Sequence, residues 1–232
     1  MVHIVLVRHG ESSANAAGIL AGRTPGVSLT PAGEQQIRGL AEIFPFRTVT
    51  EVRCSTVQRC RETAALLLTG ITAPGVREAP EFAEVDYGTW SGRRLAELKE
   101  LPEWQRVARS PSSMEFPGGE SLRDAAARAV TGVDAFVADL RARQVPDAGA
   151  GDAGGAGGTR VPVGVVVAHG DIIKAVLAAA LDMPLDAFQR IAVAPGSLSV
   201  VTYPETGYPT VTAMSVTASG RTGEAGAVGG GR

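Results

Sequence analysis

Two histidines in this chain stand at the ends of apolar runs, and each is followed by a glycine. His9 follows the run at residues 3–7 and Arg8, and His169 follows the run at residues 163–168. Apolar runs of this length predict buried strands, and ligands of α/β proteins collect at the carboxyl edge of the sheet. Because the chain has only three histidines, the repeated pattern predicts that the imidazoles of His9 and His169 meet over one pocket.

His9 has the neighbours that a nucleophile toward phosphorus needs. A neutral imidazole can attack phosphorus when one ring nitrogen is held as a donor and the other is free. The guanidinium of Arg8 would lower the pKa of His9 and could bind phosphate oxygens through its planar fork. Gly10 would let the backbone approach an anion closely, and Asn15 could donate a further hydrogen bond. His3 lacks such neighbours and is interpreted as structural.

A second basic element follows the short strand predicted at residues 49–54. Arg59 lies in the first turn of a helix predicted at residues 56–68, where free backbone N–H groups favour an anion. The alternative, a solvated helix face, suits its charged neighbours better than Arg59 itself. His169 also precedes a predicted helix and could donate to a phosphoryl oxygen.

A candidate proton donor lies in the segment Glu84-Val-Asp86. The aromatic residues Phe82, Tyr87 and Trp90 surround it in the sequence, and burial among them would raise the pKa of a carboxyl group and suit it to general acid catalysis. The residues alone leave open whether Glu84 or Asp86 has this role, and either one could be a surface charge.

The chain alternates predicted strands and helices around these residues. Thr30-Pro31 is typical of a helix start, with proline at the first helical position. Ser121-x-x-Asp124 resembles a capping box and starts a long helix. Residues 78–119 predict irregular structure with two short helices. Further elements expected toward the C-terminus are a helix at residues 171–181 and closing strands at 198–202 and 210–215.

Length and composition fit one domain. The chain has 232 residues, of which 44% are hydrophobic and 20% charged, as in ordinary globular proteins. We expect this domain to cover residues 1–218. The Gly- and Ala-rich residues 146–160 predict a flexible loop, and the Gly-rich residues 219–232 predict a disordered tail.

Charge and hydropathy exclude several classes of partner. The net charge of −2 gives no overall attraction to nucleic acid or to an anionic membrane. No apolar run approaches the ~18 residues that span a membrane. Cys54 and Cys60 form no CxxC motif, and the N-terminus lacks a signal-peptide pattern. We therefore expect a reduced, cytoplasmic protein, and the sequence leaves open whether it forms a homodimer.

The motifs together resemble the histidine phosphatase (phosphoglycerate mutase-like) superfamily, from residue 2 to about residue 203. RHGES with a following asparagine is the specific signature. It is followed in the expected order by GRTPGVSLTPAGEQQ, CSTVQRCRETA, EVDYGTWSG, FPGGES and VAHGD. The resemblance implies an α/β three-layer sandwich, with helices on both faces of a mostly parallel mixed sheet.

The resemblance also implies catalytic roles. His9 would be the nucleophile and form a phosphohistidine, and Glu84 would be the proton donor and then the base. Arg8, Arg59 and His169 would complete the phosphate pocket.

Substrate-binding roles are implied for Asn15, as an accessory phosphate contact, for Arg23, in a segment that borders the pocket, and for Gly170. No metal or other cofactor is implied. Ser55-Thr56 departs from the Ser-Pro often found in the family, and this departure touches no implied catalytic role.

The function expected is hydrolysis of a phosphomonoester of a small phosphorylated metabolite. A cofactor-dependent phosphoglycerate mutase is the alternative, because both reactions use a phosphohistidine. A mutase needs extra cations and a cover that excludes water, which the loop at 146–160 and the Gly-rich tail do not favour. Three cations favour the mutase, because they could line an entrance for a second phosphate: Arg93, Arg94 and Lys99.

Two rivals come from other classes of protein. A metal-dependent hydrolase could use His9, His169, Glu84 and Asp171, but nearby arginines would repel its cation. A non-catalytic phosphoester-binding protein is disfavoured because a nucleophile and an acid are both present.

Overall fold

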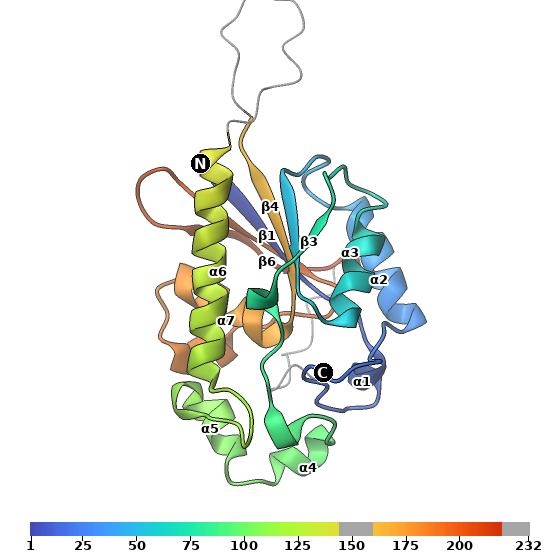
Figure 1. Cartoon of the computed structure of the whole chain (residues 1–232), viewed down its shortest axis with the longest axis vertical. Helices are drawn as coiled ribbons and strands as arrows, with labels where there is room; N and C mark the ends of the chain where they lie inside the picture. The colour runs from blue at the N-terminus through green and yellow to red at the C-terminus, as the bar shows by residue number, and fades with distance from the viewer. Residues whose placement is uncertain (144–159, 220–232) are drawn as a thin grey trace, which may run out of the picture.

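The computed structural model describes residues 1–143 and 160–219 of the chain (Figure 1). The loop expected at residues 146–160 lies outside these residues except for Arg160, and the expected tail lies outside them except for Ser219. Within the described part, no helix is both long and apolar enough to cross a membrane.

A mixed sheet forms the centre of the described structure. Its six strands have the order β3-β2-β4-β1-β5-β6. The first four run parallel to one another, whereas β5 is antiparallel to both β1 and β6. The strand bounds are β1 Val2–Arg8, β2 Glu51–Cys54, β3 Val76–Glu78, β4 Val163–Ala168, β5 Leu198–Tyr203 and β6 Thr210–Val216.

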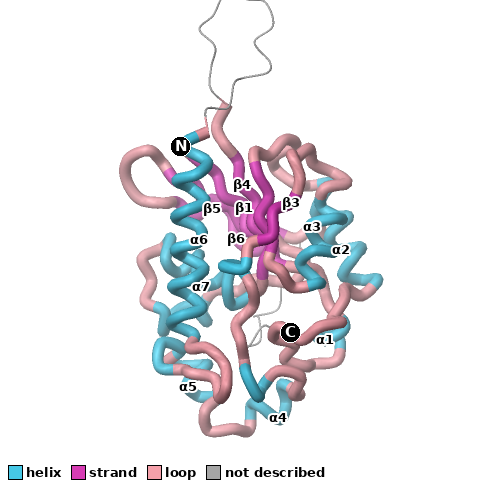
Figure 2. Tube along the Cα trace, viewed as in Figure 1, coloured by secondary structure: helices cyan, strands magenta, loops and turns pink. Residues whose placement is uncertain are grey.

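Helices cover both faces of the sheet. Figures 1 and 2 show α2 and α3 on one side and α6 and α7 on the other, with α4 and α5 beyond one edge. The α-helices are α1 Ser13–Ala16, α2 Pro31–Glu42, α3 Gln58–Leu67, α4 Leu95–Lys99, α5 Trp104–Arg109, α6 Leu122–Ala142 and α7 Gly170–Ala180. Short 3₁₀ helices are η1 Pro80–Phe82, η2 Gly88–Trp90, η3 Pro111–Ser113 and η4 Leu185–Arg190.

Alternation along β1 explains why both faces need cover. Val5 and Val7 pack in the apolar cluster under α2 and α3, whereas Ile4 and Leu6 pack in the cluster under α6 and α7. Successive side chains of a strand point to opposite faces, and a strand buried on both faces appears in the sequence as a continuous apolar run. The predicted α/β sandwich is confirmed.

The helix starts follow their caps. The hydroxyl of Thr30 accepts a hydrogen bond from the Gly33 amide at the start of α2. The hydroxyl of Ser121 accepts one from the Asp124 amide at the start of α6. Each cap satisfies a backbone donor that the first helical turn leaves unpaired. Both helix starts were predicted from the sequence.

The strand register places the strand ends side by side. Arg8 on β1 pairs with Ala168 on β4, and Cys54 on β2 pairs with Val167. The next residues continue this alignment, because the His9 amide donates to the Ala168 carbonyl oxygen at 3.1 Å. The residues that follow β1, β2 and β4 therefore meet at one edge of the sheet.

Candidate active site

The rings of His9 and His169 lie next to each other at this edge. Their centroids are 5.3 Å apart, with an interplanar angle of 62°, and both side chains are buried. The two strand-His-Gly patterns thus bring two imidazoles together, as expected from the sequence.

The hydrogen bonds of His9 define its tautomer. Its Nδ1 lies 2.8 Å from the carbonyl oxygen of Gly10, so Nδ1 carries the proton and donates. Its Nε2 accepts a hydrogen bond from Nε of Arg59 at 3.1 Å. Burial is the main cause that lowers the pKa of His9 well below its usual value, followed by the charges of Arg59 and then Arg8. Arg8 thus lowers the pKa of His9 in the expected direction, after burial and Arg59. The ring is neutral with a lone pair on Nε2.

Gly10 is required by packing. A Cβ atom at this position would lie 2.5 Å from the carbonyl oxygen of Gly33 in α2, a distance that no side chain tolerates. Gly10 was expected to let an anion approach the backbone closely, whereas its contact with Gly33 gives a different reason for a glycine at this position.

Arg59 lies at the centre of the site and is buried. Its Nη2 donates to the carbonyl oxygen of Gly22 and to Nδ1 of His169, both at 3.0 Å. Among the described residues, its Nη1 is buried without a hydrogen-bond partner. A buried donor of a cation is costly to leave unpaired, so this atom is suited to an anion.

His169 is held by a residue that the sequence analysis did not assign to the site. Its Nε2 lies 2.8 Å from the hydroxyl oxygen of Ser55. Burial, followed by the charges of Arg59 and His9, lowers the pKa of His169 well below its usual value. Ser55 directly follows β2, so the reasoning from strand ends that identified both histidines could also have identified this serine.

Glu84 is the buried carboxyl group of the site. Its Oε1 accepts from the amide of Val85 at 3.0 Å, and its Oε2 lies 3.6 Å from both Arg59 Nη2 and His169 Nδ1. Burial is the main cause that raises the pKa of Glu84 to about 7, against the opposing charge of Arg59. The side chain of Asp86 is 46% exposed. Burial therefore favours Glu84 over Asp86, a choice that the residues alone left open.

Arg8 is buried beside the helix that follows β4. Its Nη1 donates to the carbonyl oxygen of Val193 at 2.6 Å. A Cβ atom on Gly170 would lie 3.2 Å from the guanidinium carbon of Arg8. Gly170 therefore lies against Arg8 and leaves room for it.

A cavity opens onto His9. Of the residues singled out from the sequence, His9, Asn15, Arg59 and Glu84 line it, whereas Arg8, Arg23, His169 and Gly170 do not. Tyr87, Ile19, Leu20 and Ala21 are also among the residues that line it. Arg59 is the one cation among the described residues that line this cavity.

Asn15 and Arg23 both contact protein groups. The Oδ1 atom of Asn15 accepts hydrogen bonds from the amide and the hydroxyl of Ser12. Ser12 and Asn15 form a capping box at the start of α1. The guanidinium of Arg23 donates to the Glu84 carbonyl oxygen and to the Glu120 carboxylate, each at 2.7 Å. Asn15 still borders the cavity, but Arg23 is directed at the segment that carries the acid.

Two further buried residues were not assigned to phosphate chemistry by the sequence analysis. The Tyr87 hydroxyl donates to Oδ2 of Asp171 at 3.1 Å, and Lys174 Nζ lies 3.4 Å from Oδ1 of the same carboxylate. The hydrogen bonds of Asp171 therefore go to Tyr87 and Lys174. They do not go to the residues with which the metallohydrolase alternative would group it. The described residues contain no group of three or more His, Cys, Asp or Glu side chains that could hold a metal ion.

Comparison with known proteins identifies the family. The model of the histidine phosphatase superfamily (branch 1) matches residues 4–217. The adenosylcobalamin/alpha-ribazole phosphatase of Salmonella typhimurium is 38% identical over 93 residues, which cover 40% of this chain and 45% of that protein. The Enterobacter sp. protein named "probable phosphoglycerate mutase GpmB" is 27% identical over 207 residues, 88% of this chain and 86% of its own.

A solved structure agrees with these sequence matches. The native mycobacterial glucosyl-3-phosphoglycerate phosphatase superposes with a TM-score of 0.73 and 26% identity, over 92% of this chain and 98% of that chain. The relatives thus include phosphatases and a protein named as a mutase, and the family expected from the ordered motifs is confirmed. The chain belongs to the histidine phosphatase superfamily, branch 1.

Proposed function

We propose that this protein hydrolyses the phosphomonoester of a small metabolite through a phosphohistidine on His9. The observation that carries the proposal is the hydrogen bond from His9 Nδ1 to the Gly10 carbonyl oxygen, at 2.8 Å. It leaves the lone pair of Nε2 directed toward Arg59 and away from the backbone. A neutral imidazole oriented in this way is an activated nucleophile.

In the first step, His9 Nε2 attacks phosphorus, and the bond from phosphorus to the leaving oxygen breaks. Glu84, protonated, donates its proton to that oxygen, and the alcohol leaves. In the second step, ionised Glu84 takes a proton from water, whose oxygen attacks phosphorus and releases inorganic phosphate and neutral His9. A carboxyl pKa of about 7 supports both roles of Glu84 near neutral pH.

Arg59 is proposed to hold the transferring phosphoryl group, and Arg8 and His169 are proposed to complete the phosphate pocket. Two observations support this role. The Nη1 atom of Arg59 is unpaired among the described residues, and the Nε and Nη2 atoms of the same guanidinium contact the imidazoles of His9 and His169. Fixed donors that face the developing charge lower the barrier because they need no reorganisation during the reaction. The cationic side chains would thereby supply the charge stabilisation that a metal provides in other phosphatases.

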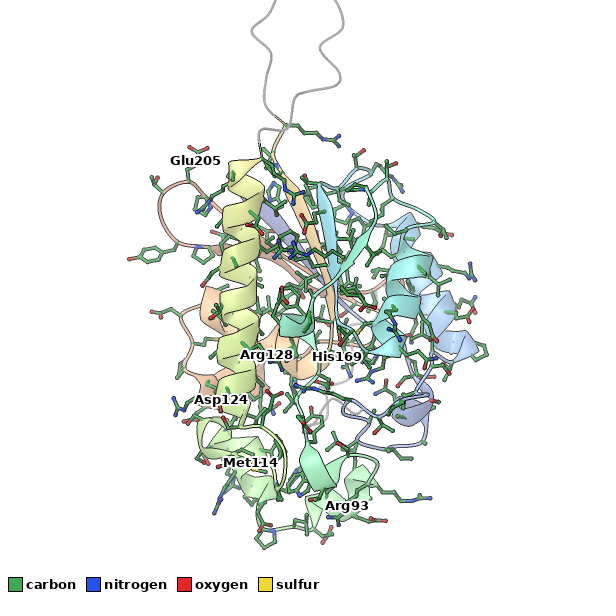
Figure 3. All side chains as sticks on the ribbon, in the orientation of Figure 1. Arg93, Met114, Asp124, Arg128, His169 and Glu205 are labelled. Atoms are coloured by element: carbon green, nitrogen blue, oxygen red, sulfur yellow. The ribbon has the colours of Figure 1, made fainter. Side chains whose placement is uncertain are left out.

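We favour hydrolysis over the mutase reaction. A mutase must hold a bisphosphorylated intermediate, whereas Arg59 is the one cation among the described residues of the cavity lining. Arg93, Arg94 and Lys99, the residues that counted in favour of a mutase, are not in that lining. Figure 3 shows Arg93 at the lower end of the molecule, below His169, and the carbonyl oxygen of Arg93 accepts a hydrogen bond at 2.9 Å from the amide of Leu20, a residue of the cavity lining.

Product analysis tests this proposal. The pure protein is assayed for inorganic phosphate release with alpha-ribazole phosphate, glucosyl-3-phosphoglycerate and 3-phosphoglycerate, and then with 3-phosphoglycerate plus a trace of 2,3-bisphosphoglycerate. We expect phosphate release from at least one phosphomonoester. Rapid formation of 2-phosphoglycerate without free phosphate would establish the mutase reaction instead.

A cytoplasmic location belongs to the same proposal, whereas the sequence leaves open whether the protein forms a homodimer. Cys54 and Cys60 are both free thiols, which supports a reducing compartment. Light scattering coupled to size-exclusion chromatography would measure the mass in solution and test the dimer.

A further inference from the structure

Arginine side chains from two distant parts of the chain hold the segment that carries Glu84. Arg128, on α6, donates through Nη1 to the carbonyl oxygens of Glu81 at 2.6 Å and Ala83 at 3.1 Å. Arg23 donates through Nε to the carbonyl oxygen of Glu84 itself at 2.7 Å. Figure 3 shows Arg128 at the same level of the molecule as His169. The backbone is therefore tied on both sides of the acid.

Glu120 joins the two arginines. Its Oε1 accepts from Nη2 of Arg23 at 2.7 Å, from Nη2 of Arg128 at 2.9 Å and from the amide of Asp86 at 2.8 Å. Hydrogen bonds from charged donors to a carboxylate are the strong ones. We call Glu120, Arg23 and Arg128 the Glu120 clasp.

Little else fixes the carboxyl group of Glu84. Its Oε1 accepts a hydrogen bond from the amide of the next residue, Val85, and its Oε2 lies 3.6 Å from both Arg59 Nη2 and His169 Nδ1, which is longer than a hydrogen bond. The place of the carboxyl group therefore follows from the place of its own backbone. A general acid must come within hydrogen-bond reach of the atom that it protonates, so a loosened backbone would cost proton transfer.

We propose that Glu120 is a positioning residue that, through Arg23 and Arg128, places Glu84 for proton donation to the leaving oxygen. This inference rests on the proposed function, and it assigns Arg23 to the acid and not to the substrate. The clasp does not touch the reacting atoms, because none of its three members lines the cavity.

The dependence of the rate on the leaving group tests the clasp. An alkyl phosphate needs a proton on its leaving oxygen, whereas 2,4-dinitrophenyl phosphate needs almost none. Because kcat/KM reports the steps through departure of the alcohol, it isolates the acid from the later base. For Glu120→Ala we expect kcat/KM to fall on the order of 100-fold with the best alkyl phosphate, the scale of a lost general acid. With 2,4-dinitrophenyl phosphate it should change little.

Three variants complete the experiment. Glu84→Gln should show the same selective loss, because it removes the acid itself. Glu120→Gln, which keeps the size and one acceptor oxygen, should give a smaller selective loss and decides the question if Glu120→Ala does not fold. Glu100→Ala changes an exposed glutamate after α4 and should leave both rates unchanged.

The outcomes separate the inference from the function on which it rests. Suppose that Glu84→Gln lowers kcat/KM selectively for the alkyl phosphate, but the Glu120 variants lower kcat/KM equally for both substrates or leave both values unchanged. The clasp then has no positioning role. If Glu84→Gln does not discriminate, Glu84 is not the proton donor, and the inference falls with that assignment.

Discussion

Arg59 donates through Nε to Nε2 of His9, at 3.1 Å. An arginine is always a charged donor, so this contact requires a lone pair on the ring nitrogen and places the imidazole proton on Nδ1. The same lone pair is the one proposed to attack phosphorus. Arg59 must therefore pass its hydrogen bond from the imidazole to the phosphoryl group when the substrate binds.

Removal of Arg59 should cost more activity than removal of any exposed arginine. Arg59→Ala should lose on the order of 3 kcal/mol of transition-state stabilisation, or about 100-fold in kcat/KM, the usual scale for one preorganised donor. Arg61→Ala is the matched control, because Arg61 lies on the same helix, is 53% exposed and pairs with Glu78. A loss below tenfold for Arg59→Ala, measured with a phosphomonoester under kcat/KM conditions, would place the phosphate elsewhere.

The pH profile of kcat/KM should report Glu84. The free enzyme needs Glu84 protonated for the first step, and its pKa is about 7. We therefore expect kcat/KM for an alkyl phosphate to fall as the pH rises above about 7. Glu84→Gln should remove this alkaline limb. A wild-type profile that stays level to pH 9 would show that the acid is another group.

Stability should depend on the same titration. The pKa of Glu84 is raised from 4.5 to about 7 in the folded protein, so the native state binds this proton more tightly than the unfolded chain does. The resulting stability is present below pH 4.5 and is lost as the pH rises through 7. The melting temperature of Glu84→Gln minus that of the wild type should therefore be more positive at pH 8 than at pH 5. Equal differences at both pH values would contradict the raised pKa.

Activity should not require a metal ion. Arg59 and Arg8 place positive charge where a metal would otherwise stand, so excess EDTA should leave the rate unchanged. Vanadate should inhibit, because it can take the five-coordinate geometry of phosphorus in the transition state. Loss of activity with EDTA and its return with added metal would instead favour a metallohydrolase.

The sequence predicts the positions of His9 and His169 because their pattern is local. An apolar run followed by His-Gly indicates a strand end, and parallel neighbours bring strand ends to one edge of the sheet. The edge strand β3 was not predicted, since Val76–Glu78 is short and exposed throughout. It therefore lacks the apolar alternation that identifies a strand.

The partners of Arg23 could not be predicted from its position in a motif. Glu120 lies 97 residues away in the chain, and the direction of a long side chain depends on what packs around it. The same limit applies to Tyr87, whose aromatic ring was recognised as a neighbour of the acid but whose bond to Asp171 depends on the tertiary fold.

The central claim is that His9 carries the phosphoryl group. Glu84→Gln with labelled 2,4-dinitrophenyl phosphate is the most direct system in which to trap it, because the good leaving group bypasses the missing acid while hydrolysis lacks its base. After a rapid quench, we predict an acid-labile, base-stable phosphate that peptide mapping places on His9, and no label when His9→Ala is added to the same chain. Label on another residue, or a His9→Ala protein that turns over at the wild-type rate, would contradict this mechanism.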